Sequence, residues 1–144
     1  MAAPSELASR SETTRQPVSH TECRRLRTVV VDDSPTFLQV ACDLLELDPL
    51  IDLIARVDTG GEAILTVMKL KPDLVLMDVN MPYLDGLTLA WFFANRFPSA
   101  RVVLMSTDDT PELREACVSS GALAFVHKEH FRQQFGTVLE QLYF

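Results

Sequence analysis

The chain has 144 residues, an apolar fraction of 47% and a net charge of −7. Its length and apolar content suit one globular domain with one core. The acidic charge argues against nucleic acid as a direct partner, because phosphate backbones bind basic surfaces. Since no apolar run reaches the ~20 residues that a membrane span needs, we also expect no insertion into a membrane.

Cysteine content and the N-terminal residues point to the cytoplasm. The three cysteines, Cys23, Cys42 and Cys117, are odd in number and fit no metal-site spacing, so we interpret them as reduced thiols. The N-terminus lacks the apolar segment of a secretory signal. Residues 1–26 are rich in Ser, Thr, Arg and Glu without apolar periodicity, which predicts a disordered tail before a folded domain at residues 27–144.

Strand and helix patterns alternate from residue 27 onward. The β-branched and apolar runs that predict strands cover residues 28–31, 51–57, 74–78, 101–105 and 124–127. Helical patterns cover residues 35–48, 62–70, 87–97, 111–120 and 129–144. Ser34-Pro35 and Thr110-Pro111 each join an N-cap residue to a proline in the first turn. Gly60-Gly61 is expected to form a turn. The alternation predicts an α/β fold, a doubly wound, five-stranded parallel sheet with five helices.

The third strand pattern ends in an acid. Asp78 stands where the apolar run stops, and Pro82 with Asp85-Gly86 predicts a loop after it, Gly86 being able to adopt φ > 0. In open α/β sheets, ligands bind at the carboxyl ends of the strands. Asp78 is therefore the first candidate for a functional residue.

Other polar residues follow the remaining strands at the same edge. Asp32 and Asp33 follow the first strand, Ser106 ends the fourth and Lys128 follows the fifth. Clustered carboxylates repel one another, and a hard cation such as Mg²⁺ relieves this repulsion. Together these groups suit transfer of a phosphoryl group onto a carboxylate, with its oxygens held by Mg²⁺ and Lys128.

Each residue alone has a plainer interpretation. Asp32-Asp33 could cap the following helix, Asp78 could belong to a turn, and Lys128 could be a solvated surface lysine. The functional interpretation rests on their joint occurrence, each at the end of a strand and in a fixed order.

That joint pattern resembles a response-regulator receiver domain of the CheY-like two-component family, which has a flavodoxin-like fold. The resemblance covers about residues 27–144. It is carried by Asp32-Asp33, by Asp78-Val79-Asn80-Met81-Pro82 with Asp85-Gly86, by Ser106 and by Lys128.

The resemblance implies a role for each matching residue. Asp78 is the implied phospho-acceptor and Lys128 the group that binds the phosphoryl oxygens. Implied Mg²⁺ ligands are Asp33, Asp78 and the Asn80 backbone carbonyl, with Asp32 acting through water. Ser106 and Phe125 would move together as a switch.

The resemblance also implies partners. A sensor histidine kinase or a histidine phosphotransfer protein would supply the phosphoryl group to a stand-alone receiver, which would act on a downstream protein partner. Apart from its own phosphorylation and dephosphorylation, no enzymatic activity is expected. The signalling surface would lie in residues 111–144, and a homodimer is possible there because the last helix has more apolar area than one face can bury. An exposed aromatic in residues 87–97, such as Trp91, would mark a further contact surface.

Two residues depart from the common family pattern. Glu129 follows Lys128 where many receivers have proline in a cis bond, so we expect a trans bond here. Thr107 follows Ser106 where alanine or glycine is common, and its bulk predicts a longer-lived phosphorylated state.

Alternative functions remain open. The chain could be a binding module that works without phosphorylation, or the receiver part of a longer DNA-binding response regulator. A Mg²⁺-dependent phosphatase is disfavoured because Asn80 stands where such enzymes carry a second acid. His20, His127 and His130 are expected to form no metal set.

Overall fold

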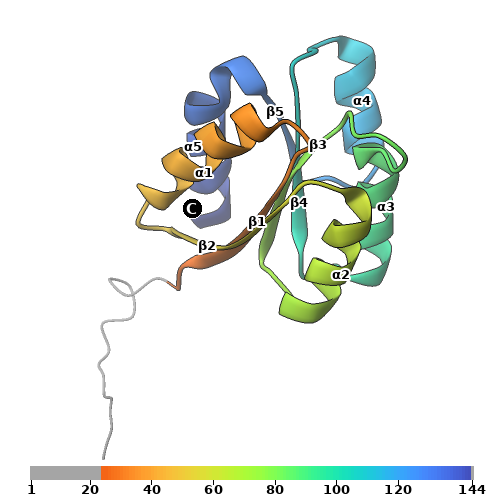
Figure 1. Cartoon of the computed structure of the whole chain (residues 1–144). Helices are drawn as coiled ribbons and strands as arrows, with labels where there is room; N and C mark the ends of the chain where they lie inside the picture. Colours follow the sequence, from red (N-terminus) through yellow and green to blue (C-terminus); the bar gives the residue numbers. More distant parts are fainter. Residues whose placement is uncertain (1–23, 144) are drawn as a thin grey trace, which may run out of the picture.

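The computed structural model describes residues 24–143, so most of the expected tail lies outside the described residues. Five strands and five α-helices alternate, as expected (Figure 1). The strands are β1 (Leu26–Val31), β2 (Ile51–Val57), β3 (Leu74–Asp78), β4 (Arg101–Ser106) and β5 (Ala124–His127). The helices are α1 (Pro35–Glu46), α2 (Gly60–Leu70), α3 (Gly86–Arg96), α4 (Pro111–Ser119), the 3₁₀ helix η1 (Lys128–His130) and α5 (Phe131–Tyr143).

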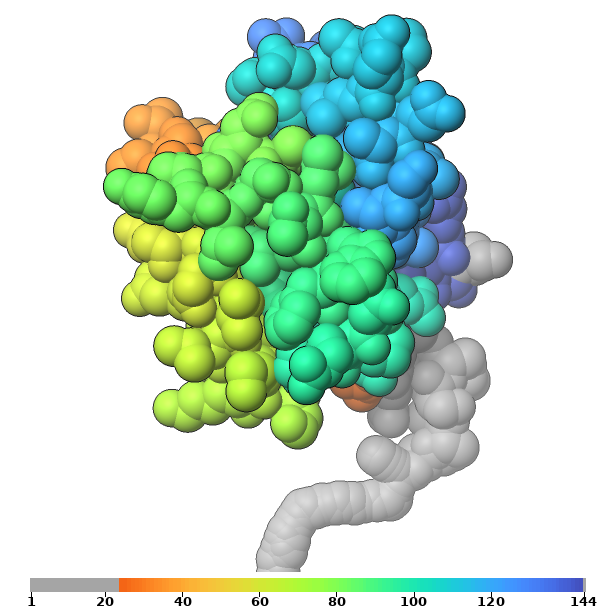
Figure 2. Space-filling model, turned by 90° about the vertical axis from the view of Figure 1, so that its right-hand side faces the viewer, coloured from red at the N-terminus to blue at the C-terminus, as the bar shows by residue number. Residues whose placement is uncertain are grey.

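All strand pairs are parallel, and the strand order is β2-β1-β3-β4-β5. Helices α1 and α5 cover one face of the sheet, and α2, α3 and α4 cover the other (Figure 1). Figure 2 shows the second face, with α3 between α2 and α4. The predicted fold class, a doubly wound flavodoxin-like sheet, is therefore confirmed.

Each face of the sheet has its own core because successive strand residues point to opposite sides. Val30 packs with Leu45 and Phe135 under α1 and α5. Val29 packs with Leu89 and Phe93 under α2, α3 and α4. The central strand β3 is buried along its whole length, which fixes the position of Asp78 at its end.

The predicted helix starts are confirmed by their caps. The Phe37 amide donates to Ser34 Oγ at 3.3 Å and the Leu113 amide donates to Thr110 Oγ1 at 3.1 Å. Helix α4 ends at Ser119, and Gly121, which has φ +90°, follows the C-cap residue Ser120.

Several boundaries differ from the predictions. β1 begins at Leu26, whose amide donates to Leu50 O at 2.8 Å and adds a residue pair with β2. Gly60 and Gly61 form the first turn of α2 rather than a separate turn, because Thr59 caps that helix. Lys128 begins a 3₁₀ turn before α5, where we expected the final helix to begin at Glu129.

Side-chain burial bears on both of the expected contact surfaces. Leu139 of the last helix is buried in the cluster with residues of α1 and the sheet, so it adds nothing to an exposed apolar surface there. Trp91 on α3 is 59% exposed. An exposed aromatic on this helix is what the sequence analysis took as the mark of a further contact surface. Among the described residues, no helix is long and apolar enough to span a membrane.

Candidate functional site

Three carboxylates meet at the carboxyl edge of the sheet. β1 and β3 are neighbours, and their last paired residues are Val31 and Met77, so Asp32 and Asp78 follow side by side. Asp32, Asp33 and Asp78 offer oxygens that all lie within 4.8 Å of one another. Asp32 and Asp78 are buried, whereas Asp33 is exposed. The parallel topology thus brings the three predicted acids together.

Lys128 lies in the same cluster. Its Nζ atom is 2.6 Å from Asp32 Oδ2 and 3.5 Å from Asp78 Oδ1, and its side chain is only 9% exposed. The other Asp32 oxygen accepts a hydrogen bond from the Ser34 amide at 2.9 Å. The ammonium also lies 4.5 Å from the centre of the Phe37 ring. It is therefore held by two carboxylates and an aromatic face.

Phe37 is the site residue that the sequence analysis missed. The available signal was its position in the first turn of α1, four residues after Asp33, where a long side chain reaches the strand ends. An aromatic ring there excludes water from the ammonium and adds a cation–π contact.

The charge balance of the cluster is visible at Asp78. Burial, and then repulsion from Asp32, raise the pKa of Asp78 to about 6. Lys128 and the Asn80 amide, which donates to Asp78 Oδ1 at 3.3 Å, oppose this rise and do not cancel it. Three carboxylates share one ammonium in this cluster, and their oxygen donors fit a hard divalent cation such as Mg²⁺.

Ser106 lies at the same edge, at the end of β4. Asp78 pairs with Met105 on this strand, which places Ser106 one residue further along. Its buried Oγ accepts hydrogen bonds from the Asp108 amide at 2.9 Å and from Asn80 Nδ2 at 3.5 Å. The Asn80 side chain thus links the Asp78 loop to Ser106.

Phe125 lies apart from the acids, on β5. Its ring is half-buried against the core under α2, α3 and α4. The Arg114 guanidinium carbon lies 5.3 Å from the ring centre.

The peptide bond between Lys128 and Glu129 is trans, as expected.

The fold and the site define a doubly wound α/β domain with three acids and a lysine at the carboxyl edge of its sheet. The family model of the response regulator receiver domain matches residues 28–140. The chain belongs to this family, as its sequence pattern indicated. Receiver domains are parts of two-component response regulators, accept phosphoryl groups, generally bind Mg²⁺ at an acidic pocket, and interact with histidine kinases and effectors.

Curated relatives include larger proteins. The chain is 37% identical over 105 residues to a protein-glutamate methylesterase/protein-glutamine glutaminase 2 of Methanospirillum hungatei, covering 72% of this chain and 30% of the relative. It is 28% identical over 105 residues to the transcriptional regulatory protein DegU of Brevibacillus brevis, covering 73% of this chain and 44% of the relative. The chain thus spans less than half the length of these relatives.

Solved receiver domains share the fold. The receiver domain of the response regulator NarL from Mycobacterium tuberculosis superposes with a TM-score of 0.77 at 27% identity, covering 83% of this chain and 97% of that chain. The response regulator domain of Thermotoga maritima CheB gives a TM-score of 0.70 at 27% identity, with 83% and 94% covered.

Proposed function

We propose that the chain is a phosphorylation-switched receiver that accepts a phosphoryl group on Asp78 from a phosphohistidine donor. The observation that carries this proposal is the cluster itself. Three carboxylates lie within 4.8 Å of one another, and Lys128 lies between Asp32 and Asp78. A structural ion pair needs one acid, whereas this site has two surplus acids at a ligand-binding edge.

The transfer forms an acyl phosphate. A carboxylate oxygen of Asp78 attacks phosphorus, the bond from phosphorus to the donor imidazole nitrogen breaks, and that nitrogen keeps the electron pair. Lys128 is close enough to Asp78 to bind the phosphoryl oxygens, and the hydrophobic side of the site at Phe37 shields this charge pair from water.

The proposed metal set uses the oxygens of this edge. Asp33, Asp78 and the Asn80 backbone carbonyl would hold Mg²⁺, with Asp32 acting through water. The bound ion would supply positive charge beside the phosphoryl oxygens. The fit rests on the donor set, because Asp32, Asp33 and Asp78 offer carboxylate oxygens within 4.8 Å of one another beside the single ammonium of Lys128.

The proposed switch uses Ser106 and Phe125. Ser106 Oγ now accepts a hydrogen bond from the Asp108 amide, and a phosphoryl group on Asp78 offers its hydroxyl a stronger, charged acceptor. Movement of Ser106 would free space for Phe125 to turn inward. The surface formed by α4, β5 and α5 would then change its affinity for a downstream protein or a second copy.

A cytoplasmic, stand-alone receiver is the proposed form, with no catalysis beyond its own phosphorylation and dephosphorylation. The second candidate is the receiver part of a longer DNA-binding regulator, because the chain spans only 44% of DegU. Immunoblotting of the source cells with an antibody to residues 27–144 distinguishes the two by the mass of the native protein.

Intact-protein mass measurement tests the phosphorylation. The full chain is incubated with Mg²⁺ and a small acyl phosphate, beside Asp78→Ala and the control Asp58→Asn, which changes an exposed acid after the edge strand β2. We expect the wild type and Asp58→Asn to gain one phosphoryl group and Asp78→Ala to gain none. A gain in all three would refute Asp78 as the nucleophile. No gain in any would favour the phosphorylation-independent binding module.

A further inference from the structure

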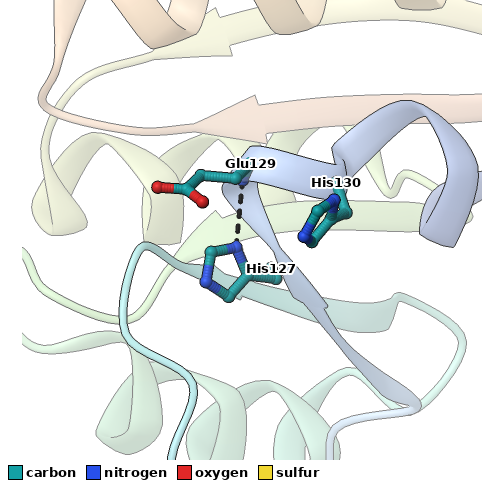
Figure 3. Close-up of side chains that lie close together, drawn as sticks. All are labelled: His127, Glu129 and His130. Carbon is teal, nitrogen blue, oxygen red and sulfur yellow. Dashed lines mark hydrogen bonds between the residues drawn. The ribbon is translucent and has the colours of Figure 1, made fainter.

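A second group of possible metal ligands lies on the outer side of the turn between β5 and α5. His127, Glu129 and His130 offer ligand atoms that all lie within 4.8 Å of one another (Figure 3). The sequence analysis expected no metal set among the three histidines, and it did not consider His127 and His130 together with Glu129. His20, the third histidine, lies outside the described residues.

The 3₁₀ turn produces this arrangement. In a 3₁₀ helix, side chains three residues apart lie on the same side, and His127 caps η1 three residues before His130. The two imidazole rings have their centres 5.4 Å apart and are tilted by 44°. The sequence analysis expected an α-helix from Glu129 and assigned His127 to the strand, so it did not pair the two.

A backbone hydrogen bond engages the His127 ring. The Glu129 backbone amide donates to His127 Nδ1 at 3.1 Å (Figure 3). A neutral imidazole has one nitrogen lone pair, so a metal ion that binds this ring must release the Glu129 amide. That amide belongs to an exposed residue that water can reach.

The turn itself is held in place by its neighbours. The His127 amide donates to Gln134 Oε1 of α5 at 2.8 Å, and the Lys128 side chain is anchored at Asp32. The turn is therefore anchored at His127 and Lys128, while the Glu129 amide exchanges its partner when a metal ion binds. Anchoring of the first two residues reduces the ordering cost of binding.

We propose that His127, Glu129 and His130 form a binding site for a divalent late first-row transition metal, with Zn²⁺ as the representative ion. Two imidazoles and one carboxylate suit Zn²⁺, Cu²⁺ and Ni²⁺, whereas Mg²⁺ prefers oxygen ligands only. Water completes the coordination. The site is separate from the acid cluster and does not depend on phosphorylation of Asp78.

The proposed site has a structural consequence for Lys128. The lysine lies between two of the ligands in the sequence, and its side chain points to Asp32 and Asp78 on the other side of the turn. A metal ion bound to the flanking residues would brace the segment that carries this ammonium.

Calorimetric titration with Zn²⁺ tests the site. The full chain carries His20→Gln and Cys23→Ser, which remove the nitrogen and sulfur donors of the N-terminal region, and excess Mg²⁺ occupies the acid cluster. We expect this background to bind one Zn²⁺ per chain. Adding His130→Ala or His127→Gln should weaken binding at least about tenfold, since even loss of an outer-shell partner costs that much.

A spectroscopic readout identifies the ligands. Co²⁺ in place of Zn²⁺ should give visible absorption bands in the background protein and lose them in His130→Ala, an exposed position whose change should leave the fold intact by circular dichroism. The proposal is overturned if the background binds no Zn²⁺, or if His130→Ala and His127→Gln bind it as tightly as the background.

Discussion

The Arg114 guanidinium lies over the ring of Phe125, with its carbon 5.3 Å from the ring centre. The same guanidinium pairs with Asp109, Nη2 donating to Oδ2 at 2.8 Å. Asp109 follows Asp108, whose amide holds Ser106 Oγ. Arg114 therefore connects the loop that positions Ser106 with the aromatic ring proposed to move with it.

Removing this connection should ease the proposed switch. Arg114→Ala frees both the Phe125 ring and the loop before α4, and a partly exposed cation–π contact contributes about 0.5–1 kcal/mol. If the inward position of Phe125 favours phosphorylation, the rate with a small acyl phosphate and Mg²⁺ should rise about 2–5-fold. Phosphorylation is followed by intact-protein mass over time.

The chain offers a matched control for this prediction. Arg96 lies over Phe92 at 5.8 Å in an equivalent cation–π pair on α3. Arg96→Ala should leave the phosphorylation rate unchanged. Equal rates in wild type and Arg114→Ala would show that the contact does not restrain the switch.

The raised pKa of Asp78 predicts a pH-dependent stability of the metal-free protein. The folded state binds this proton more tightly than the unfolded state, so the stabilising contribution is full below pH ~4 and is lost as the pH rises to about 6. Asp78→Asn should therefore raise the free energy of unfolding at pH 7, on the order of 2–3 kcal/mol. Urea unfolding with a chelator present measures the difference.

Two comparisons distinguish the effect of the Asp78 charge from a general effect of substitution on stability. The gap between wild type and Asp78→Asn should close as the pH falls to ~4, and Mg²⁺ should stabilise the wild type more than the variant at pH 7. Asp58→Asn, at an exposed position, should change stability by less than about 0.5 kcal/mol. A gap that stays constant with pH would contradict the raised pKa that burial and repulsion from Asp32 give to Asp78.

Loss of Lys128 should destabilise the metal-free fold. Lys128→Met keeps the length of the side chain over Phe37 and leaves Asp32, which is fully buried, without its cation. Breaking a buried pair in this way costs about 3–5 kcal/mol. Thermal unfolding in chelator should show the loss, and Mg²⁺ should recover part of it. Lys69→Met, on the exposed side of α2, is the control expected to change little.

The strand ends show why the sequence was informative. A parallel sheet places every carboxyl end at one edge, so the position of Asp32, Asp78, Ser106 and Lys128 in the chain was enough to predict that they meet. The alternation of strands and helices likewise determined the layers. These features depend on order along the chain, which sequence patterns report directly.

The features that were missed depend on three-dimensional contacts. Phe37 borders Lys128 because α1 lies beside α5, where the ring centres of Phe37 and Phe131 are 5.7 Å apart. His127 meets His130 because the chain forms one 3₁₀ turn before α5. Neither contact produces a periodic pattern in the sequence. The positive φ expected of Gly86 was also wrong. In this loop the residue with a positive φ is Tyr83, at 71°.

Asp73 should stabilise the amino-terminal edge of the sheet at neutral pH. Although partial burial raises it, the pKa of Asp73 is lowered overall by hydrogen bonds from the Arg24 side chain and the Arg27 amide. The hydrogen bond from the Arg27 backbone amide to Asp73 Oδ2 is 2.8 Å long. The two hydrogen bonds from the Arg24 guanidinium to the same carboxylate are 3.0 and 2.9 Å long. This stabilisation is present above pH ~4 and is lost as the pH falls through the lowered pKa.

Asp73→Asn should therefore cost about 1.5–3 kcal/mol of unfolding free energy at pH 7, the range for hydrogen bonds to a charged group. The cost should shrink below pH ~4. Arg24→Ala should cause a smaller loss, because the Arg27 bond remains. Chemical unfolding from pH 3 to pH 7 checks both variants, and a cost for Asp73→Asn that does not change with pH would rule out the charged hydrogen bonds as its source.

Gly86 is needed for close approach of the backbone rather than for a special φ. Its amide donates to Val79 O at 2.8 Å, and a Cβ on Gly86 would lie 2.3 Å from the backbone oxygen of Asp78 and 2.8 Å from Val79 Cα. These are backbone atoms, which cannot turn aside as a side chain can. Gly86→Ala should therefore destabilise the fold by about 3 kcal/mol or more and weaken Mg²⁺ binding, because the loop after Asp78 must shift.

Gly136 provides the matched test of this argument. It lies within α5, and a Cβ there meets nothing within 4 Å. Gly136→Ala should stabilise the protein by about 0.5–1 kcal/mol, the helix preference of alanine over glycine. Urea unfolding and Mg²⁺ titration of the two variants give opposite expected signs for stability. If Gly86→Ala behaved like Gly136→Ala, the approach of the Gly86 backbone to Asp78 would not constrain the site.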